Sequence, residues 1–244
     1  MDDQELNNTL TDIYRRLFTR YGPQHWWPAR TPFEVIIGAI LTQSAAWANV
    51  EKAIENLRHA GKLSTEALRQ LPQSKLAGLI YSCGYYNVKA RKLKAFAAWL
   101  GEQCGDDLHR LFKQDTADLR RELLAVYGIG EETADSILLY AGNKPVFVID
   151  AYTRRIIDRL GMSPERQSYA DYQALFMAHL PADSHLFNEY HALFVKLAKE
   201  VCRTRPLCGD CCLNPGVKTV MAYAGGRFPC AGFIKNTKTL KFPR

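Results

Sequence analysis

The sequence predicts an all-α protein, and three observations carry this prediction. Apolar residues recur at spacings of three and four, the period of a helix with one buried face, in segments along the chain. Glycine and proline stand at the ends of several of these segments, where they end or begin helices. No segment shows a convincing alternation of apolar and polar residues, the pattern of a half-buried strand.

The first expected helix spans Leu6 to Tyr21, and Gly22-Pro23 ends it. Trp26 and Trp27 follow, in a segment that Pro28 keeps from being helical. Two large aromatic side chains next to each other on a loop cannot both point into one core. We therefore expect at least one of them to line a groove or a pocket, with anchoring of the first helix in the core as the alternative.

A nearly all-apolar segment, Phe33 to Leu41, predicts a central helix that has Pro32 in its first turn. This helix ends at Thr42-Gln43-Ser44, and the next helix runs from about Trp47 to His59. From periodicity alone, Gln43 is a capping or loop residue.

Short helices at about Ser64–Leu71 and Ser74–Ile80 lead to the turn Gly84-Tyr85-Tyr86-Asn87 and to a helix over Val88–Leu100. Four cations crowd the first half of that helix: Lys89, Arg91, Lys92 and Lys94. A solvated helix face explains such a cluster. Beside an aromatic turn it also suits contacts with DNA phosphates, which position a protein without reading sequence.

Helices at Leu108–Phe112 and Thr116–Tyr127 precede two glycines, Gly128 and Gly130, and a further helix continues from Thr133. Two glycines one residue apart allow a tight turn whose backbone N–H groups point outward. A phosphate oxygen is favoured there by the free donors and by the dipole of the following helix. A plain turn between two helices is the alternative.

An extended apolar run, Val146-Phe147-Val148-Ile149, delivers a single carboxylate, Asp150. A carboxylate at the end of a buried run is costly unless it is paired or used. A basic helix over Ala151–Leu160 follows, and its dipole would help to keep Asp150 ionised. Helices at Tyr169–His179 and Phe187–Val201 complete the all-helical inventory.

The chain has 244 residues, a net charge of +7 and a pI near 9.0, which suits a polyanionic partner or an ordinary solubilising surface. No apolar run approaches the roughly 20 residues that cross a bilayer, and the polar start is no signal peptide. We therefore expect a cytoplasmic protein. Seven cysteines are then not expected to form disulfides, and Cys83 and Cys104 are interpreted as packing residues.

Taken together, these segments resemble the endonuclease III-like, helix-hairpin-helix superfamily of DNA glycosylases. Trp26-Trp27-Pro28 followed by Trp47 is more similar to the 3-methyladenine DNA glycosylase III branch than to the enzymes for pyrimidine damage. The resemblance covers roughly residues 25–212 and is carried by these motifs: Leu41-Thr42-Gln43, Gly84 to Ala90, Gly128-Ile129-Gly130 with Asp150, and the late cysteines.

The resemblance implies a two-lobed, all-α fold. A six-helix barrel containing the helix-hairpin-helix would occupy residues 33–145, and a terminal lobe with the late cysteines would combine residues 1–32 and 146–244. It also implies a monomeric, nucleoid-associated protein with no membrane partner. The ligand would be double-stranded DNA containing a damaged base, bound in a cleft between the lobes.

The resemblance further assigns roles to single residues. Asp150 would be catalytic, because an ionised carboxylate stabilises the cationic sugar that develops as an N-glycosidic bond breaks, and it orients or deprotonates the attacking water. Gln43 would fill the gap left by the flipped base, and Tyr85 would face the opposite strand. Other DNA contacts and the base pocket would come from these residues: Lys89, Gly128 and Gly130 for DNA; Trp26, Trp27, Pro28 and Trp47 for the pocket.

Two departures from the superfamily pattern refine the expected activity. Bifunctional members carry a lysine two residues after the second hairpin glycine, where this chain has Glu132, and a carboxylate cannot form a Schiff base. We therefore expect a monofunctional glycosylase without an efficient AP-lyase step. The second departure lies in the motif His191-Ala192-Leu193, where relatives often carry a cation at the position of Leu193. Because this chain lacks that cation, the identity of the substrate stays open.

An aromatic pocket suits an electron-poor, positively charged purine such as 3-methyladenine. Glycosylases for uracil, mismatched thymine or oxidised pyrimidines are the enzymatic alternatives. A non-catalytic module that binds damaged DNA is another alternative, and the presence of Asp150 argues against it.

Superfamily members with a [4Fe–4S] cluster hold it by four cysteine thiolates near the carboxyl end. Cys202, Cys208 and Cys211 match three of them, with one residue fewer in the first gap. Cys212 or Cys230 would have to be the fourth ligand. We expect a structural cluster, with zinc or free thiols as alternatives.

Overall fold

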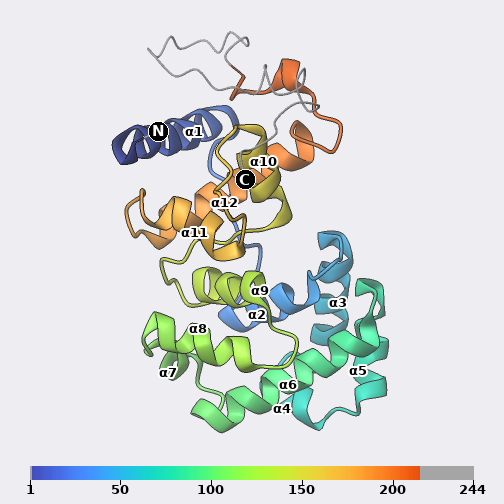
Figure 1. The fold of residues 1–244 in the computed structure, drawn as a ribbon. Helices are drawn as coiled ribbons and strands as arrows, with labels where there is room; N and C mark the ends of the chain where they lie inside the picture. The colour runs from blue at the N-terminus through green and yellow to red at the C-terminus, as the bar shows by residue number, and fades with distance from the viewer. Residues whose placement is uncertain (1, 215–244) are drawn as a thin grey trace. The chain divides into compact units, whose positions relative to one another are not determined.

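The computed structural model describes residues 2–214, and every regular element in that range is helical (Figure 1). The all-α prediction is therefore confirmed for the described part of the chain. None of the described helices combines the length and the apolar character that a membrane span requires. The described chain divides into two compact units, Trp27–Val146 and a second unit formed by residues 2–26 with 147–214.

The unit Trp27–Val146 contains more helices than the six expected, because several segments form helices of only five to seven residues. Its short 3-10 and π-helical turns are η1 (Tyr81–Cys83) and η2 (Ile137–Ala141). Its α-helices are α2 (Pro32–Leu41), α3 (Trp47–His59), α4 (Thr65–Gln70), α5 (Gln73–Leu79), α6 (Tyr86–Cys104), α7 (Leu108–Phe112), α8 (Thr116–Ala125) and α9 (Glu131–Ser136).

Helix α2 is the central helix of this unit, as its apolar sequence predicts. All residues from Glu34 to Leu41 are buried, and the Thr31 side chain caps the helix by accepting a hydrogen bond from the Glu34 amide. Helix α6 packs against α4 and α5 (Figure 1). Leu93, Phe96 and Leu100 are among its buried apolar residues. Each fully buried side chain of this kind contributes roughly 1.5–3 kcal/mol to stability.

The second unit contains α1 (Asp3–Tyr21), α10 (Ala151–Arg159), α11 (Tyr169–Met177), α12 (Ser184–Glu200) and the 3-10 turn η3 (Cys208–Asp210). Its core is aromatic: Phe147 stacks on Phe176 with ring centroids 3.9 Å apart, and both rings contact Tyr190 edge-on. The extended run that ends at Asp150 is buried from Phe147 to Ile149. The segment that precedes Asp150 is therefore fixed by packing on α11 and α12.

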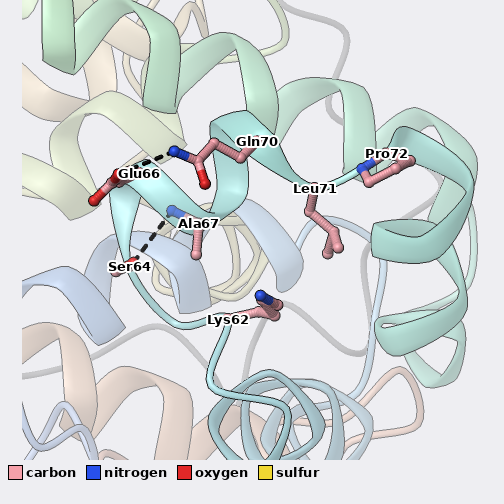
Figure 2. Close-up of a pocket in the computed structure, with 7 residues that line it drawn as sticks. All are labelled: Lys62, Ser64, Glu66, Ala67, Gln70, Leu71 and Pro72. Atoms are coloured by element: carbon pink, nitrogen blue, oxygen red, sulfur yellow. Dashed lines mark hydrogen bonds between the residues drawn. The ribbon is translucent and has the colours of Figure 1, made fainter.

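A pocket of about 420 Å³ lies beside α4 and the residues that flank it (Figure 2). Ser64 and Glu66 at its rim already bind the Ala67 amide and the Gln70 side chain. The pocket contains none of the residues that the sequence predicts for a functional site.

Candidate functional site

The turn between α8 and α9 has the predicted glycine hairpin. Gly128 has a φ of +81°, which only glycine adopts without strain. A Cβ atom there would also lie 2.4 Å from Cγ of Lys92 on α6, so a side chain at this position would require Lys92 to move. Gly130 is exposed and caps α9, and a Cβ atom there would meet nothing within 4 Å.

Gln43 lies directly after α2 and rests on this hairpin. Its Nε2 donates to the Gly128 carbonyl oxygen at 3.0 Å and to Oγ1 of Thr133 at 2.9 Å. Its Oε1 accepts a hydrogen bond from Nζ of Lys92. Three contacts therefore hold the half-buried amide between the hairpin and α6.

The expected DNA contact by Lys89 is wrong, because its side chain is only 2% exposed. Its Nζ donates to the carbonyl oxygens of Leu41, at 2.9 Å, and Cys83, at 2.7 Å. Burial lowers the pKa of this amine. Lys89 thus connects the end of α2 with the turn that presents Tyr85, which is 73% exposed and has a φ of +44°.

The other cations of α6 also bind the protein itself. Lys94 donates to three carbonyl oxygens around the end of α4, at 2.6 to 3.1 Å. Arg91 is exposed, and its guanidinium carbon lies 4.0 Å from the ring centroid of Tyr127, next to the hairpin. Of the four cations, Arg91 is the exposed one, so most of the cluster supports the loops rather than forming a free basic face.

The predicted pocket tryptophans are divided between the two units. Trp27 packs edge-on against Trp47, with centroids 5.4 Å apart, and against Tyr140 at 5.2 Å. A Cβ atom at Gly38 would lie 3.2 Å from the Trp27 ring, so this glycine gives the indole room beside α2. Trp26 belongs to the other unit, where Lys199 lies 5.9 Å from its ring, and Pro28 is exposed.

Asp150 is the N-cap residue of α10. One carboxylate oxygen accepts a hydrogen bond from the Thr153 amide at 2.7 Å, and the other lies 3.6 Å from Nε2 of His191 on α12. Burial raises the pKa of this carboxyl, but His191 and Thr153 lower it by more, so the net pKa lies below its ordinary value. Since 14% of the side chain stays exposed, the site holds an accessible carboxylate that is ionised at neutral pH.

His191 is a site residue to which the sequence analysis gave no role. It is 5% exposed and lies on α12 between Tyr190 and Phe194, which are completely buried. A buried polar side chain in such an apolar stretch costs free energy unless it has a partner. The apolar residues around His191 in the sequence were therefore the signal that it has one. The identity of the partner depends on the packing of α12 on α10.

Within the described residues, the late cysteines do not form the group of ligands that a metal site requires. Among residues 2–214, no three histidine, cysteine, aspartate or glutamate side chains are placed to hold a metal ion. Cys202, Cys208, Cys211 and Cys212 supply no such group, and burial raises the pKa of the Cys212 thiol to about 12. Cys230 lies outside the described residues.

Arginines from α10 hold the loop that carries these cysteines. Arg155 donates to the Cys202 carbonyl oxygen at 3.0 Å, and Arg159 donates to the carbonyl oxygens of Arg203 and Thr204 at 2.6 and 3.0 Å. Arg159 also lies 3.3 Å from the Cys202 sulfur. The loop is thus attached to α10 by hydrogen bonds from this helix.

The hairpin and Asp150 both lie inside residues 37–182, which match the HhH-GPD superfamily of base excision DNA repair proteins. The chain belongs to this superfamily. The HhH-GPD match extends beyond Asp150 and past the end of α11, so it includes parts of both units.

Relatives of this HhH-GPD protein agree with the assignment. A putative DNA repair glycosylase of Methanocaldococcus jannaschii is 44% identical over 201 residues, which cover 82% of this chain and 91% of the relative. Endonuclease III of Thermotoga maritima is 28% identical over 206 residues, which cover 84% and 90%. The 3-methyladenine DNA glycosylase MagIII of H. pylori, solved with bound 1,N6-ethenoadenine, is 28% identical with a TM-score of 0.67, covering 82% of this chain and 98% of MagIII.

The comparisons support an endonuclease III-like DNA glycosylase of base excision repair. At the hairpin of this HhH-GPD protein, Glu131 and Glu132 occupy the first turn of α9, and both are exposed. Acidic residues at this position are stabilised by the helix dipole. The hairpin therefore presents the Glu132 carboxylate at the position where the sequence pattern of bifunctional glycosylases has a lysine.

Proposed function

We propose that this protein is a monofunctional DNA glycosylase that hydrolyses the N-glycosidic bond of a damaged base flipped out of double-stranded DNA. The observation that carries the proposal is the accessible, ionised carboxylate of Asp150 at the amino end of α10. A negative charge that is buried on most sides and fixed by a backbone amide stabilises positive charge well, because it needs no reorganisation during the reaction.

In the proposed reaction, the bond between C1′ and the base nitrogen breaks, and its electron pair leaves with the base. The sugar becomes an oxocarbenium-like cation, which Asp150 stabilises electrostatically. A water oxygen then bonds to C1′ and gives up a proton to Asp150 or to solvent. The products are the free base and an abasic site, without a strand break.

The absence of a lyase step is proposed from the hairpin. Glu132 is exposed in the first turn of α9, and its carboxylate has no amine to attack the sugar. Lys89, the lysine among the predicted site residues, is buried against two carbonyl oxygens, and its pKa is lowered. Its role is to connect loops, so it is not the missing nucleophile.

An alkylated purine such as 3-methyladenine is the proposed base. The cluster of Trp27, Trp47 and Tyr140 supports this choice, because the π face of an aromatic ring favours a base with positive charge. Such a base also leaves readily without a strong general acid. The similarity to the H. pylori 3-methyladenine glycosylase supports the same choice.

Contacts with DNA are proposed for four of the predicted residues. The exposed Gly130 and the adjacent turn at Gly128 offer backbone donors at the start of α9. Gln43 and Tyr85 are proposed to fill the gap left by the flipped base and to face the opposite strand, respectively. Both lie at the ends of the loops that Lys89 connects.

The test is a base-release assay on duplexes that contain an alkylated purine, uracil, a mismatched thymine or an oxidised pyrimidine. The wild type is compared with Asp150→Asn and with a matched control, Asp183→Asn. Asp183 caps α12 through the amides of His185 and Leu186, as Asp150 caps α10, and asparagine preserves such a cap.

We expect release of free 3-methyladenine by the wild type and by Asp183→Asn, and its loss in Asp150→Asn. Release of a pyrimidine instead would correct the substrate, and full activity of Asp150→Asn would overturn the mechanism. Strand cleavage without added base would contradict the monofunctional assignment.

A further inference from the structure

The imidazole of His191 lies beside the carboxylate of Asp150 within the second unit. Nε2 lies 3.6 Å from the free carboxylate oxygen, and only 7% of the histidine side chain is exposed. The other carboxylate oxygen is already bound by the Thr153 amide. The two contacts approach the carboxylate from different helices, α10 and α12, and together they fix its orientation.

Several other ionisable groups near this pair contact other parts of the protein. They lie on α1, α10 and α12, and α11 also packs on α12 through the Phe176 ring. Their contacts are Arg16 with Asp12, Arg154 with the Tyr172 ring, Arg155 with the Cys202 carbonyl, Asp158 with the Tyr172 hydroxyl, Arg159 with the Arg203 carbonyl, Glu189 with the Gln24 amide, Tyr190 with the Leu10 carbonyl and Lys196 with Glu200.

We propose that His191 is a positioning residue for Asp150, and that its protonated imidazole forms a buried ion pair that fixes the orientation and the charge of the carboxylate. Removal of one partner from a buried pair leaves an uncompensated charge, so each partner depends on the other. The catalytic consequence rests on the proposed function, whereas the ion pair itself does not.

The pair has a defined effect on pH dependence. Burial alone raises the pKa of Asp150, and the contribution of His191 offsets it so that the net pKa is lowered. Stability from this carboxylate is thus present above its unfolded pKa and is lost as the pH falls through the lower, folded pKa. Without His191, Asp150 takes up a proton at higher pH, and the acid limb of the base-release rate moves upward.

Two substitutions separate charge from hydrogen bonding. His191→Gln places an amide nitrogen near the position of Nε2 and keeps a donor without a charge, whereas His191→Leu removes both. We expect the acid limb of the single-turnover rate to move to higher pH in both variants, and further in His191→Leu. Loss of rate at all pH values, with an unchanged acid limb, would show a merely structural role and would overturn the proposal.

A second measurement does not depend on catalysis or on the leucine variant. NMR titration of the His191 ring in the full chain is compared between the wild type and Asp150→Asn, in which asparagine keeps the helix cap. Linkage requires the carboxylate to favour the protonated ring as much as the ring favours the carboxylate. We expect His191 to release its proton at lower pH in Asp150→Asn than in the wild type.

Identical titration of His191 in the two proteins would overturn the ion pair. A shifted titration in a protein that releases no base from any duplex would instead support the ion pair and overturn the proposed function. The two failures are therefore distinguishable.

Discussion

Gln43 and Asp150 are both polar side chains at the end of a buried segment, but they are held in opposite ways. Gln43 is a neutral amide whose three hydrogen bonds, to Gly128, Thr133 and Lys92, can each be exchanged for another donor or acceptor. Asp150 is a charge fixed by a helix amide and by His191. A neutral hydrogen bond contributes only about 1 kcal/mol net, whereas an unpaired buried charge costs several times more. Gln43 can therefore leave its hydrogen bonds at a small cost in free energy, whereas Asp150 can leave its partners only at a large one.

The largest expected effect compares the two sites directly. Asp150→Asn should lower the single-turnover rate of base release by about 10²–10⁴-fold, the range for loss of a group that acts on the reacting atoms. Gln43→Ala should weaken binding and lower the rate by about tenfold, because hydrogen bonds of this kind are replaceable. An equally large loss in Gln43→Ala would show that the comparison is wrong.

A smaller effect, on stability, concerns the hairpin that supports Gln43. Gly128→Ala should lower the free energy of unfolding by roughly 1–3 kcal/mol, because the positive φ is strained for alanine and the new Cβ collides with Lys92. Gly130→Ala is the matched control, since its φ is −97° and its surroundings are open. Denaturant unfolding of both variants is the measurement, and equal stabilities would contradict this account of the turn.

Substitution of Lys89 tests whether the basic cluster supports loops or binds DNA. Lys89→Met should cost roughly 1–3 kcal/mol of unfolding free energy, because the carbonyl oxygens of Leu41 and Cys83 lose their buried donor. The slope of log K against log salt for DNA binding should stay unchanged.

Arg91→Met is the matched exposed control for Lys89→Met. Its unfolding free energy should change little, while the salt slope should fall by about one unit if Arg91 contacts a phosphate. A reduced salt slope in Lys89→Met would show that Lys89 contacts DNA despite its burial.

The smallest effect is expected for Lys92, the cation that holds Gln43. Burial lowers the pKa of the Lys92 amine, because the protonated amine loses contact with water. The hydrogen bond from this amine to Oε1 of Gln43 offsets part of that loss. Lys92→Met should free the Gln43 amide at a cost of about 1 kcal/mol or less in stability. Amide exchange of the Gln43 side chain, measured by NMR, should become faster; an unchanged rate would show that the hairpin alone holds it.

Local sequence patterns predicted the helices better than the contacts between them. The bounds of α3 and α7 agree with the prediction residue for residue, because apolar spacing and end signals act within one segment. Helix α1 begins three residues earlier than expected, at Asp3, since the Asp2 side chain caps a first turn that has no apolar residue. Helix α6 continues through Gly101 to Cys104, where Gly105 caps it with a φ of +62°.

The roles of charged residues depended on packing that a linear pattern does not contain. A lysine has a long apolar stem, so Lys89 and Lys94 reach carbonyl oxygens of other segments instead of solvent. In the same way, Asp150 was found from its place after a buried run, but its partner His191 comes from a distant helix. The spacing of Cys202, Cys208 and Cys211 suggested a cluster, whereas among residues 2–214 no three side chains are placed to hold a metal ion.

The π-helical turn Ile137–Ala141 has a consequence for the aromatic cluster. A π turn accommodates one residue more than an α turn, which changes the direction of every side chain after it. Tyr140 lies in this turn and meets Trp27 there. Deletion of one residue of the turn ahead of Tyr140 would restore regular winding and rotate the tyrosine by about 100° around the helix axis. The tyrosine–indole contact thus depends on a single inserted residue, and a one-codon deletion would abolish it without changing any aromatic side chain.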